Sequence, residues 1–174
     1  MSETILVVIT NGGMAMATLM RVLLVDDHVM VRQGIRALLE TYPNIEVVGE
    51  AGDGEDGLLQ VIELQPSVVV MDITMPRMDG VTSTRLIKTY YPRTAVIGLS
   101  ILAHSYPIDA MIKAGACEVI TKEKAVDELY DAIQRAVNAV RPILVREDAP
   151  VSSKRFQRQQ AAAEKPRSIN GCPH

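Results

Sequence analysis

Five short runs of aliphatic, largely β-branched residues divide the chain between residues 21 and 122, and helical spacing of apolar residues follows each run. Such runs are typical of strands buried on both faces of a sheet. Strands that alternate with helices predict a parallel sheet with right-handed crossovers and helices on both faces. The runs are RVLLV (21–25), IEVVGEA (45–51), SVVVMD (67–72), TAVIGLS (94–100) and CEVITK (117–122).

The stretches that follow these runs repeat apolar residues every three or four positions, which predicts five helices. In the second stretch, Leu58, Leu59 and Ile62 share the apolar face of the expected helix. The fourth stretch has Pro107 in its first turn, where proline is tolerated, and ends at Gly115. The predicted helices are residues 29–40, 54–65, 80–92, 107–116 and 125–140.

Polar residues of chemical interest stand at the ends of the predicted strands. Asp26 and Asp27 follow the first run, Asp72 ends the third, Ser100 ends the fourth and Lys122 ends the fifth. In open α/β sheets the ligand site is the crevice beyond the carboxyl ends of the strands. A parallel sheet therefore brings all of these side chains to one edge, whereas solvated surface residues would be scattered.

The composition describes an ordinary globular protein with room for one domain and extensions in its 174 residues. Because aromatic residues make up only 3%, the core must consist of Val, Ile, Leu, Met and Ala. A net charge of −3 gives no general electrostatic footprint for nucleic acid. Cys117 and Cys172 form no metal-binding pattern, so a reducing, cytoplasmic setting is expected, with Cys117 as a small buried filler.

The two ends of the chain differ from the regular middle. Residues 1–19 are expected to form a loosely ordered extension, although ILVVIT could add an edge strand. Glu3 stands where a signal peptide would carry Lys or Arg, and no apolar run is long enough to cross a membrane. Residues 142–174 lack periodicity and contain scattered Lys and Arg, which predicts a flexible basic tail. Contact of this tail with nucleic acid or an acidic partner is the alternative.

Three carboxylates gathered at one edge repel one another unless a cation neutralises them. Oxygen ligands with room for water suit Mg²⁺ best. Asp27 and Asp72 are expected to be direct ligands, and Asp26 to act directly or through water. The turn through DITMP can aim the carbonyl of Thr74 at the same ion.

A carboxylate at such a site can act as a nucleophile and form an acyl phosphate. Asp72 is therefore the expected acceptor of a phosphoryl group. Lys122 would pair with one phosphoryl oxygen, and Ser100 would donate a hydrogen bond to another. The metal and the positioning of these groups would supply most of the catalysis.

Four segments of the chain resemble, in order, the signature blocks of the bacterial response-regulator receiver domain: RVLLVDDH, VVVMDITMPRMDG, AVIGLS and AGACEVITKE. The resemblance covers residues 20–141, and DDHVMVRQGIRALLE and VDELYDAIQRAV are similar in particular to the NarL/LuxR class. It implies a flavodoxin-like (βα)5 fold, a five-stranded parallel sheet with strand order 2-1-3-4-5. It also implies a sensor histidine kinase as phosphodonor.

The resemblance also implies a role for each matching residue. Asp72 corresponds to the phosphoacceptor and Lys122 to the lysine of the last block. Ser100 corresponds to the switch hydroxyl and Thr74 to the backbone ligand of the metal. The acidic metal-binding pair is Asp26 and Asp27.

Two features depart from the family pattern. Val119 stands where the family usually has Tyr or Phe, which puts a relay through an aromatic rotamer in doubt. NarL/LuxR regulators continue into a helix-turn-helix output domain, whose pattern is not recognisable after residue 141. DNA binding is therefore not supported by this chain alone.

The function that these residues predict best is a phosphorylation-controlled switch in two-component signal transduction, with partner binding and transcription regulation as outputs. Such a protein is not an enzyme beyond its own phosphotransfer and slow dephosphorylation, and a receiver homodimer stays open. One alternative is a metal-dependent aspartyl phosphohydrolase, but Thr74 stands where that class usually has a second Asp. The other is a phosphorylation-independent interaction module, against which the complete Asp, Ser and Lys set argues.

Overall fold

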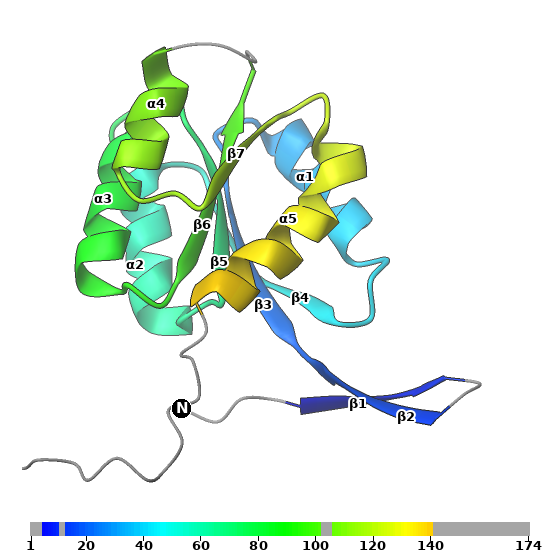
Figure 1. The fold of residues 1–174 in the computed structure, drawn as a ribbon. Helices are drawn as coiled ribbons and strands as arrows, with labels where there is room; N and C mark the ends of the chain where they lie inside the picture. Colours follow the sequence, from blue (N-terminus) through cyan, green and yellow to red (C-terminus); the bar gives the residue numbers. More distant parts are fainter. Residues whose placement is uncertain (1–4, 11–12, 102–105, 141–174) are drawn as a thin grey trace, which may run out of the picture. The chain divides into compact units, whose positions relative to one another are not determined.

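Five parallel strands form the central sheet of the computed structural model, which describes residues 5–10, 13–101 and 106–140. The strand order is β4-β3-β5-β6-β7, which is 2-1-3-4-5 when these five strands are numbered along the chain (Figure 1). The predicted fold class is therefore confirmed. The strands are β3 (Met20–Val25), β4 (Ile45–Ala51), β5 (Val68–Asp72), β6 (Ala95–Ser100) and β7 (Glu118–Thr121).

A helix follows each of these strands, as the alternating pattern predicts. The helices α1 and α5 cover one face of the sheet, and α2, α3 and α4 cover the other (Figure 1). Helices on both faces are what a parallel sheet requires, because each crossover returns over one face. The helices are α1 (Val29–Leu39), α2 (Gly54–Leu64), α3 (Gly80–Tyr90), α4 (Tyr106–Lys113) and α5 (Ala125–Val140).

The central strand β5 is buried along its whole length and divides the core into two layers. Val68 and Val70 pack in the layer under α1 and α5, whereas Val69 and Met71 pack in the layer under α2, α3 and α4. This division follows from the alternation of side chains along a strand. The continuous apolar run VVVM is thus explained by two buried faces.

The buried face of α2 differs from the sequence prediction. Leu59 and Ile62 are exposed to 60% and 48%, whereas Val61 is fully buried and Leu58 is half-buried. Gly57 decides the orientation, because a Cβ at this position would lie 3.0 Å from both methyl groups of Val25. The small residue lets the helix approach β3, so the small-residue side packs on the sheet and two large side chains face outward.

Two features outside the central strands differ from what the sequence suggested. Cys117 is exposed rather than buried, because it precedes β7 at the edge of the sheet. The segment ILVVIT, for which a loosely ordered extension was expected and an edge strand was the alternative, forms the strand β1 (Ile5–Thr10), which is not part of the central sheet. It pairs antiparallel with β2 (Gly13–Thr18) in a separate two-stranded sheet.

Two expectations concern membranes and the last residues of the chain. Within the part of the chain that the structure describes, no helix has the length and apolarity needed to span a membrane. The predicted flexible tail, residues 142–174, lies outside the described residues.

Candidate functional site

Three aspartates from two neighbouring strands meet at the carboxyl edge of the sheet. Asp26 and Asp27 follow β3, and Asp72 is the last residue of β5. The two strands pair in register up to Val25 and Met71, so their ends lie side by side. Carboxylate oxygens of the three aspartates lie within 4.8 Å of one another. The predicted convergence of these side chains is therefore found.

Burial distinguishes the members of this acidic cluster. Asp26 and Asp72 are exposed to only 2% and 3%, whereas the side chain of Asp27 is exposed to 29%. Burying a carboxylate is costly unless a charge or a set of hydrogen bonds compensates it. The cluster therefore needs cations, and its exposed member gives solvent a route to the site.

Lys122 supplies one of these cations. Its Nζ lies 2.7 Å from Oδ2 of Asp26 and 2.7 Å from Oδ2 of Asp72. The residue follows β7 directly, and its backbone N–H donates to the carbonyl of Ser100 at the end of β6. The ends of four adjacent strands, β3, β5, β6 and β7, thus contribute to one polar site.

The protonation of the pair reflects competition between burial and charge. Burial raises the pKa of Asp72 above its ordinary value, the hydrogen bond from Lys122 opposes this, and the charge of Asp26 adds to it. Burial lowers the pKa of Lys122, but its hydrogen bonds to Asp26 and Asp72 outweigh this effect and leave the pKa raised. The ammonium group therefore stays charged at neutral pH and faces the carboxylates of Asp26 and Asp72.

The loop after the acceptor strand is held close to Asp72. The N–H of Thr74 donates to Oδ1 of Asp72 at 3.3 Å, and the N–H of Gly80 donates to the carbonyl of Ile73 at 3.0 Å. A Cβ at Gly80 would lie 2.0 Å from the carbonyl oxygen of Asp72. Only glycine allows α3 to begin this near the strand end. The role of the Thr74 carbonyl as a metal ligand stays a prediction.

The positions of Ser100 and Val119 follow from the pairing of β6 with its neighbours. Ser100 is buried and pairs with Thr121, while the residue before it pairs with Asp72. Ser100 therefore ends one strand away from the predicted acceptor. Val119 is half-buried and packs in the layer under α2, α3 and α4. An aliphatic side chain therefore stands where the family usually has Tyr or Phe, so no aromatic ring can rotate at this position.

His28 also belongs to the acidic cluster, although its place in the sequence favoured a residue that marks the start of a helix over a metal ligand. It stands at the N-cap of α1, where its side chain makes no capping hydrogen bond. Its Nδ1 also lies 2.8 Å from Oδ1 of Asp27 and 3.3 Å from Oδ1 of Asp26. Its place directly after the acidic pair was the signal that could have indicated this contact.

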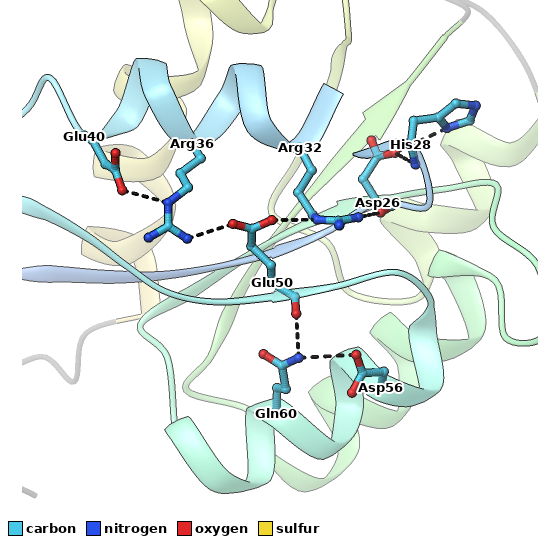
Figure 2. Close-up of polar contacts among 8 residues, drawn as sticks. All are labelled: Asp26, His28, Arg32, Arg36, Glu40, Glu50, Asp56 and Gln60. Carbon is cyan, nitrogen blue, oxygen red and sulfur yellow. Dashed lines mark hydrogen bonds and ion pairs between the residues drawn. The ribbon is translucent and has the colours of Figure 1, made fainter. Parts of the chain in front are cut away.

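Arg32 of α1 is a second residue that contacts the end of the acidic pair, although helical spacing places it on the outer side of α1. Its Nη1 donates to the carbonyl oxygen of Asp26 at 2.5 Å, and its Nε donates to Glu50 at 2.7 Å (Figure 2). Helical spacing could not indicate this contact, because it joins the first turn of a helix to the end of the preceding strand.

The donor set of the cluster fits a hard divalent cation. Carboxylate oxygens are the ligands that Mg²⁺ takes in proteins, usually with several waters retained. Asp26, Asp27 and Asp72 supply such oxygens within a short distance of one another, and Asp27 is open to water. The nominal excess of negative charge over Lys122 also favours a divalent ion at this place.

The comparison with known protein families decides between the remaining classes. The response regulator receiver domain matches residues 22–134, which include every member of the site. The chain belongs to this family. It is therefore a receiver of two-component signalling, with an acidic pocket of the kind in which receiver domains generally bind Mg²⁺.

Curated relatives of this receiver include transcriptional regulatory proteins and a protein-glutamate methylesterase/protein-glutamine glutaminase of Geobacter sulfurreducens. The receiver is 37% identical to the transcriptional regulatory protein LiaR of Bacillus subtilis over 156 residues, which are 90% of this chain and 70% of LiaR. It spans between 41% and 55% of the length of several other curated relatives.

Solved structures agree with the fold of this receiver. The response regulator domain of Thermotoga maritima CheB matches with a TM-score of 0.65 and 32% identity over 69% of this chain and 97% of that domain. The receiver domain of a NarL regulator from Mycobacterium tuberculosis matches with a TM-score of 0.65 and 28% identity over 68% and 96%. The predicted resemblance to the NarL/LuxR class is confirmed.

Proposed function

We propose that Asp72 accepts a phosphoryl group from a sensor histidine kinase, with Mg²⁺ held by Asp26, Asp27, Asp72 and the carbonyl of Thr74. The observation that carries this proposal is the ammonium group of Lys122, which lies 2.7 Å from carboxylate oxygens of both Asp26 and Asp72. A buried carboxylate that faces a fixed cation can receive an anionic group whose charge that cation then shares.

The transfer requires one bond to form and one to break. A carboxylate oxygen of Asp72 attacks phosphorus, and an acyl phosphate forms as the bond between phosphorus and the imidazole nitrogen of the donor breaks. The electron pair stays with that nitrogen, which takes up a proton. Mg²⁺, when bound, offsets negative charge on the phosphoryl oxygens.

Residues of this chain then hold the product. Lys122 moves its ion pair from the carboxylate to a phosphoryl oxygen, and the hydroxyl of Ser100 donates a hydrogen bond to another. The N–H of Thr74, which faces Oδ1 of Asp72 in the structure, is a further donor beside the new group. Rearrangement of these contacts changes the surface near β6 and β7 and so alters partner binding.

The proposed protein is a switch rather than a hydrolase. A hydrolase of the aspartyl class needs a second carboxylic acid to drive turnover, and Thr74 stands two residues after Asp72 instead. The phosphoryl group is therefore retained long enough to act as a signal. A sensor histidine kinase and a second copy of the receiver are partners that fit this role. Regulation of transcription is an output that fits it. The free thiol of Cys117 fits a reducing, cytoplasmic setting.

Incubation with Mg²⁺ and acetyl phosphate, followed by intact-mass measurement, tests the proposal. We expect a single phosphoryl adduct that decays slowly, that is absent without Mg²⁺ and that Asp72→Asn abolishes. Asp131→Asn is the matched control, because Asp131 is an exposed aspartate on α5. Rapid release of many equivalents of phosphate would support the hydrolase, and an adduct that persists in Asp72→Asn would contradict the choice of acceptor.

A further inference from the structure

A second cation, the guanidinium of Arg32, contacts the acidic cluster from α1. It bonds to the main chain of Asp26 rather than to a carboxylate of the cluster. Arg32, on the first turns of α1, donates from Nη1 to the carbonyl oxygen of Asp26 at 2.5 Å. Its side chain is exposed to only 15%. Figure 2 shows the guanidinium between Asp26 and Glu50. A long side chain that is mostly covered and bonded at two nitrogens has little freedom to move.

Glu50 fixes the other end of this guanidinium. Its Oε2 accepts from Nε of Arg32 at 2.7 Å, and its Oε1 accepts from Nη1 of Arg36 at 2.7 Å. The hydrogen bonds from Arg36 and Arg32 hold the pKa of Glu50 below its ordinary value. The carbonyl of Glu50 accepts from Gln60 of α2 at 2.6 Å. The network therefore ties α1 and α2 to β4 immediately beside the site.

The main chain of Asp26 is held on both sides as a result. Its N–H donates to the carbonyl of Ala51, and its carbonyl accepts from Arg32. Its carboxylate accepts from the N–H of His28 at 2.8 Å. Because Asp26 is anchored at its N–H, its carbonyl and its side chain, its carboxylate is held in one arrangement. The carboxylate of the next residue, Asp27, is held with it.

We propose that Arg32 is a positioning residue, which holds the turn of Asp26 and Asp27 in the arrangement that binds Mg²⁺. This inference rests on the proposed function, because it assigns the same acidic cluster as the metal site. It concerns the contact of Arg32 with the carbonyl of Asp26, and Glu50 supports that contact from β4.

The sign of the effect separates positioning from simple charge. Removal of a cation near an acidic cluster should tighten Mg²⁺ binding if only Coulomb attraction mattered. Loss of the arrangement of the ligands should weaken it instead. Groups that orient metal ligands typically change the affinity for the metal by about 10–100-fold when removed.

Titration of Mg²⁺ into the full chain, followed by calorimetry without phosphodonor, tests the proposal. We expect Arg32→Met to weaken Mg²⁺ binding by about tenfold, the lower end of that range. Arg36→Met is the matched control, because Arg36 lies one turn later on α1 and shares the carboxylate of Glu50. Within the described residues, its own bonds go to Glu40 and Glu50. We expect its affinity for Mg²⁺ to be unchanged or slightly higher.

Arg32→Lys gives a second measurement if the methionine variant does not fold. It keeps the charge but has a single nitrogen in place of the two that contact Asp26 and Glu50, so we expect an affinity between those of Arg32→Met and the parent chain. Equal affinities in the Arg32 variants and the parent would overturn the proposal, as would equal weakening in Arg36→Met. Failure of Asp72 to take up phosphate would overturn the proposed function and leave this titration meaningful.

Discussion

Single residues from three elements determine the electrostatics at the carboxyl edge of the sheet. Lys122 neutralises part of the charge of Asp26 and Asp72 directly. Arg32 and Arg36 instead pair with Glu50, whose pKa is lowered by these two cations, and no carboxylate among the described residues contributes to that shift. The two sets of charges therefore respond differently to pH, since one is crowded by like charges and the other is not.

Glu50 gives a pH dependence whose sign follows from its surroundings. Its pKa in the folded chain lies below the ordinary value of 4.5. Its stabilising effect is therefore complete above pH 4.5 and is lost as the pH falls through the lower, folded value. We expect Glu50→Gln to lower the free energy of unfolding by about 1 kcal/mol at pH 7, with a difference that shrinks below pH 4.5. Urea unfolding across this range measures it.

Glu46→Gln is the control for this prediction, since Glu46 is an exposed glutamate on the same strand. The free energy of unfolding of Glu46→Gln should match that of the parent chain at pH 7 and below pH 4.5. A Glu50→Gln difference that grew on acidification would contradict the assigned sign.

The junction between β5 and α3 shows how an element limits the site. The first residue of α3, Gly80, packs against the carbonyl oxygen of Asp72. The side chain of Asp79 accepts from the N–H of Thr82 and caps the helix at the same point. The helix start and the strand end are thus in direct contact, and neither can shift alone.

Gly80→Ala tests this contact. The added methyl group would meet the Asp72 carbonyl, so either the strand end or the helix must move. We expect a loss of about 1–3 kcal/mol in the free energy of unfolding, which denaturant titration measures.

Gly34→Ala on α1 is the matched control, because nothing lies within 4 Å of an added Cβ there. We expect this variant to gain about 0.5–1 kcal/mol from helix propensity. Equal changes in the two variants would show that propensity, and not the contact with Asp72, decides the effect.

Across the whole molecule, the fold was predictable because strand burial, helix spacing and strand-end polarity agree. Asp26, Asp72, Ser100 and Lys122 could be placed at one edge from their positions after apolar runs. The alternation alone did not fix the strand order, which came from the four matching blocks of residues. Features that depend on close packing escaped prediction.

Two helical residues and one bond illustrate what escaped. Leu59 and Ile62 face outward because Gly57 lets the small side of α2 approach Val25. Periodicity ranks faces by hydrophobicity and does not register such an approach. The bond from Arg32 to the Asp26 carbonyl joins a side chain to the main chain, and no spacing rule covers it.

Binding of Mg²⁺ should stabilise the whole receiver, since the ligands come from separate strands that unfolding would part. We expect about 2.7 kcal/mol of added unfolding free energy at a Mg²⁺ concentration 100 times the dissociation constant. At the same concentration, Asp27→Asn should lose most of this gain and Asp131→Asn should keep it. Denaturant titration with and without Mg²⁺ measures the difference, and an equal gain in all three chains would contradict the assigned site.

The strands that carry the two partners of the central ion pair are unequally anchored. Asp72 ends β5, which is bonded to neighbours on both sides, whereas Lys122 follows β7, a four-residue edge strand that pairs, among the described residues, only with β6. Edge strands open at a smaller free-energy cost than central ones. Lys122 can therefore separate from Asp72 when the end of β7 opens locally, while Asp72 keeps its place. Replacement of Lys122 as the partner of Asp72 then does not require the core around β5 to open.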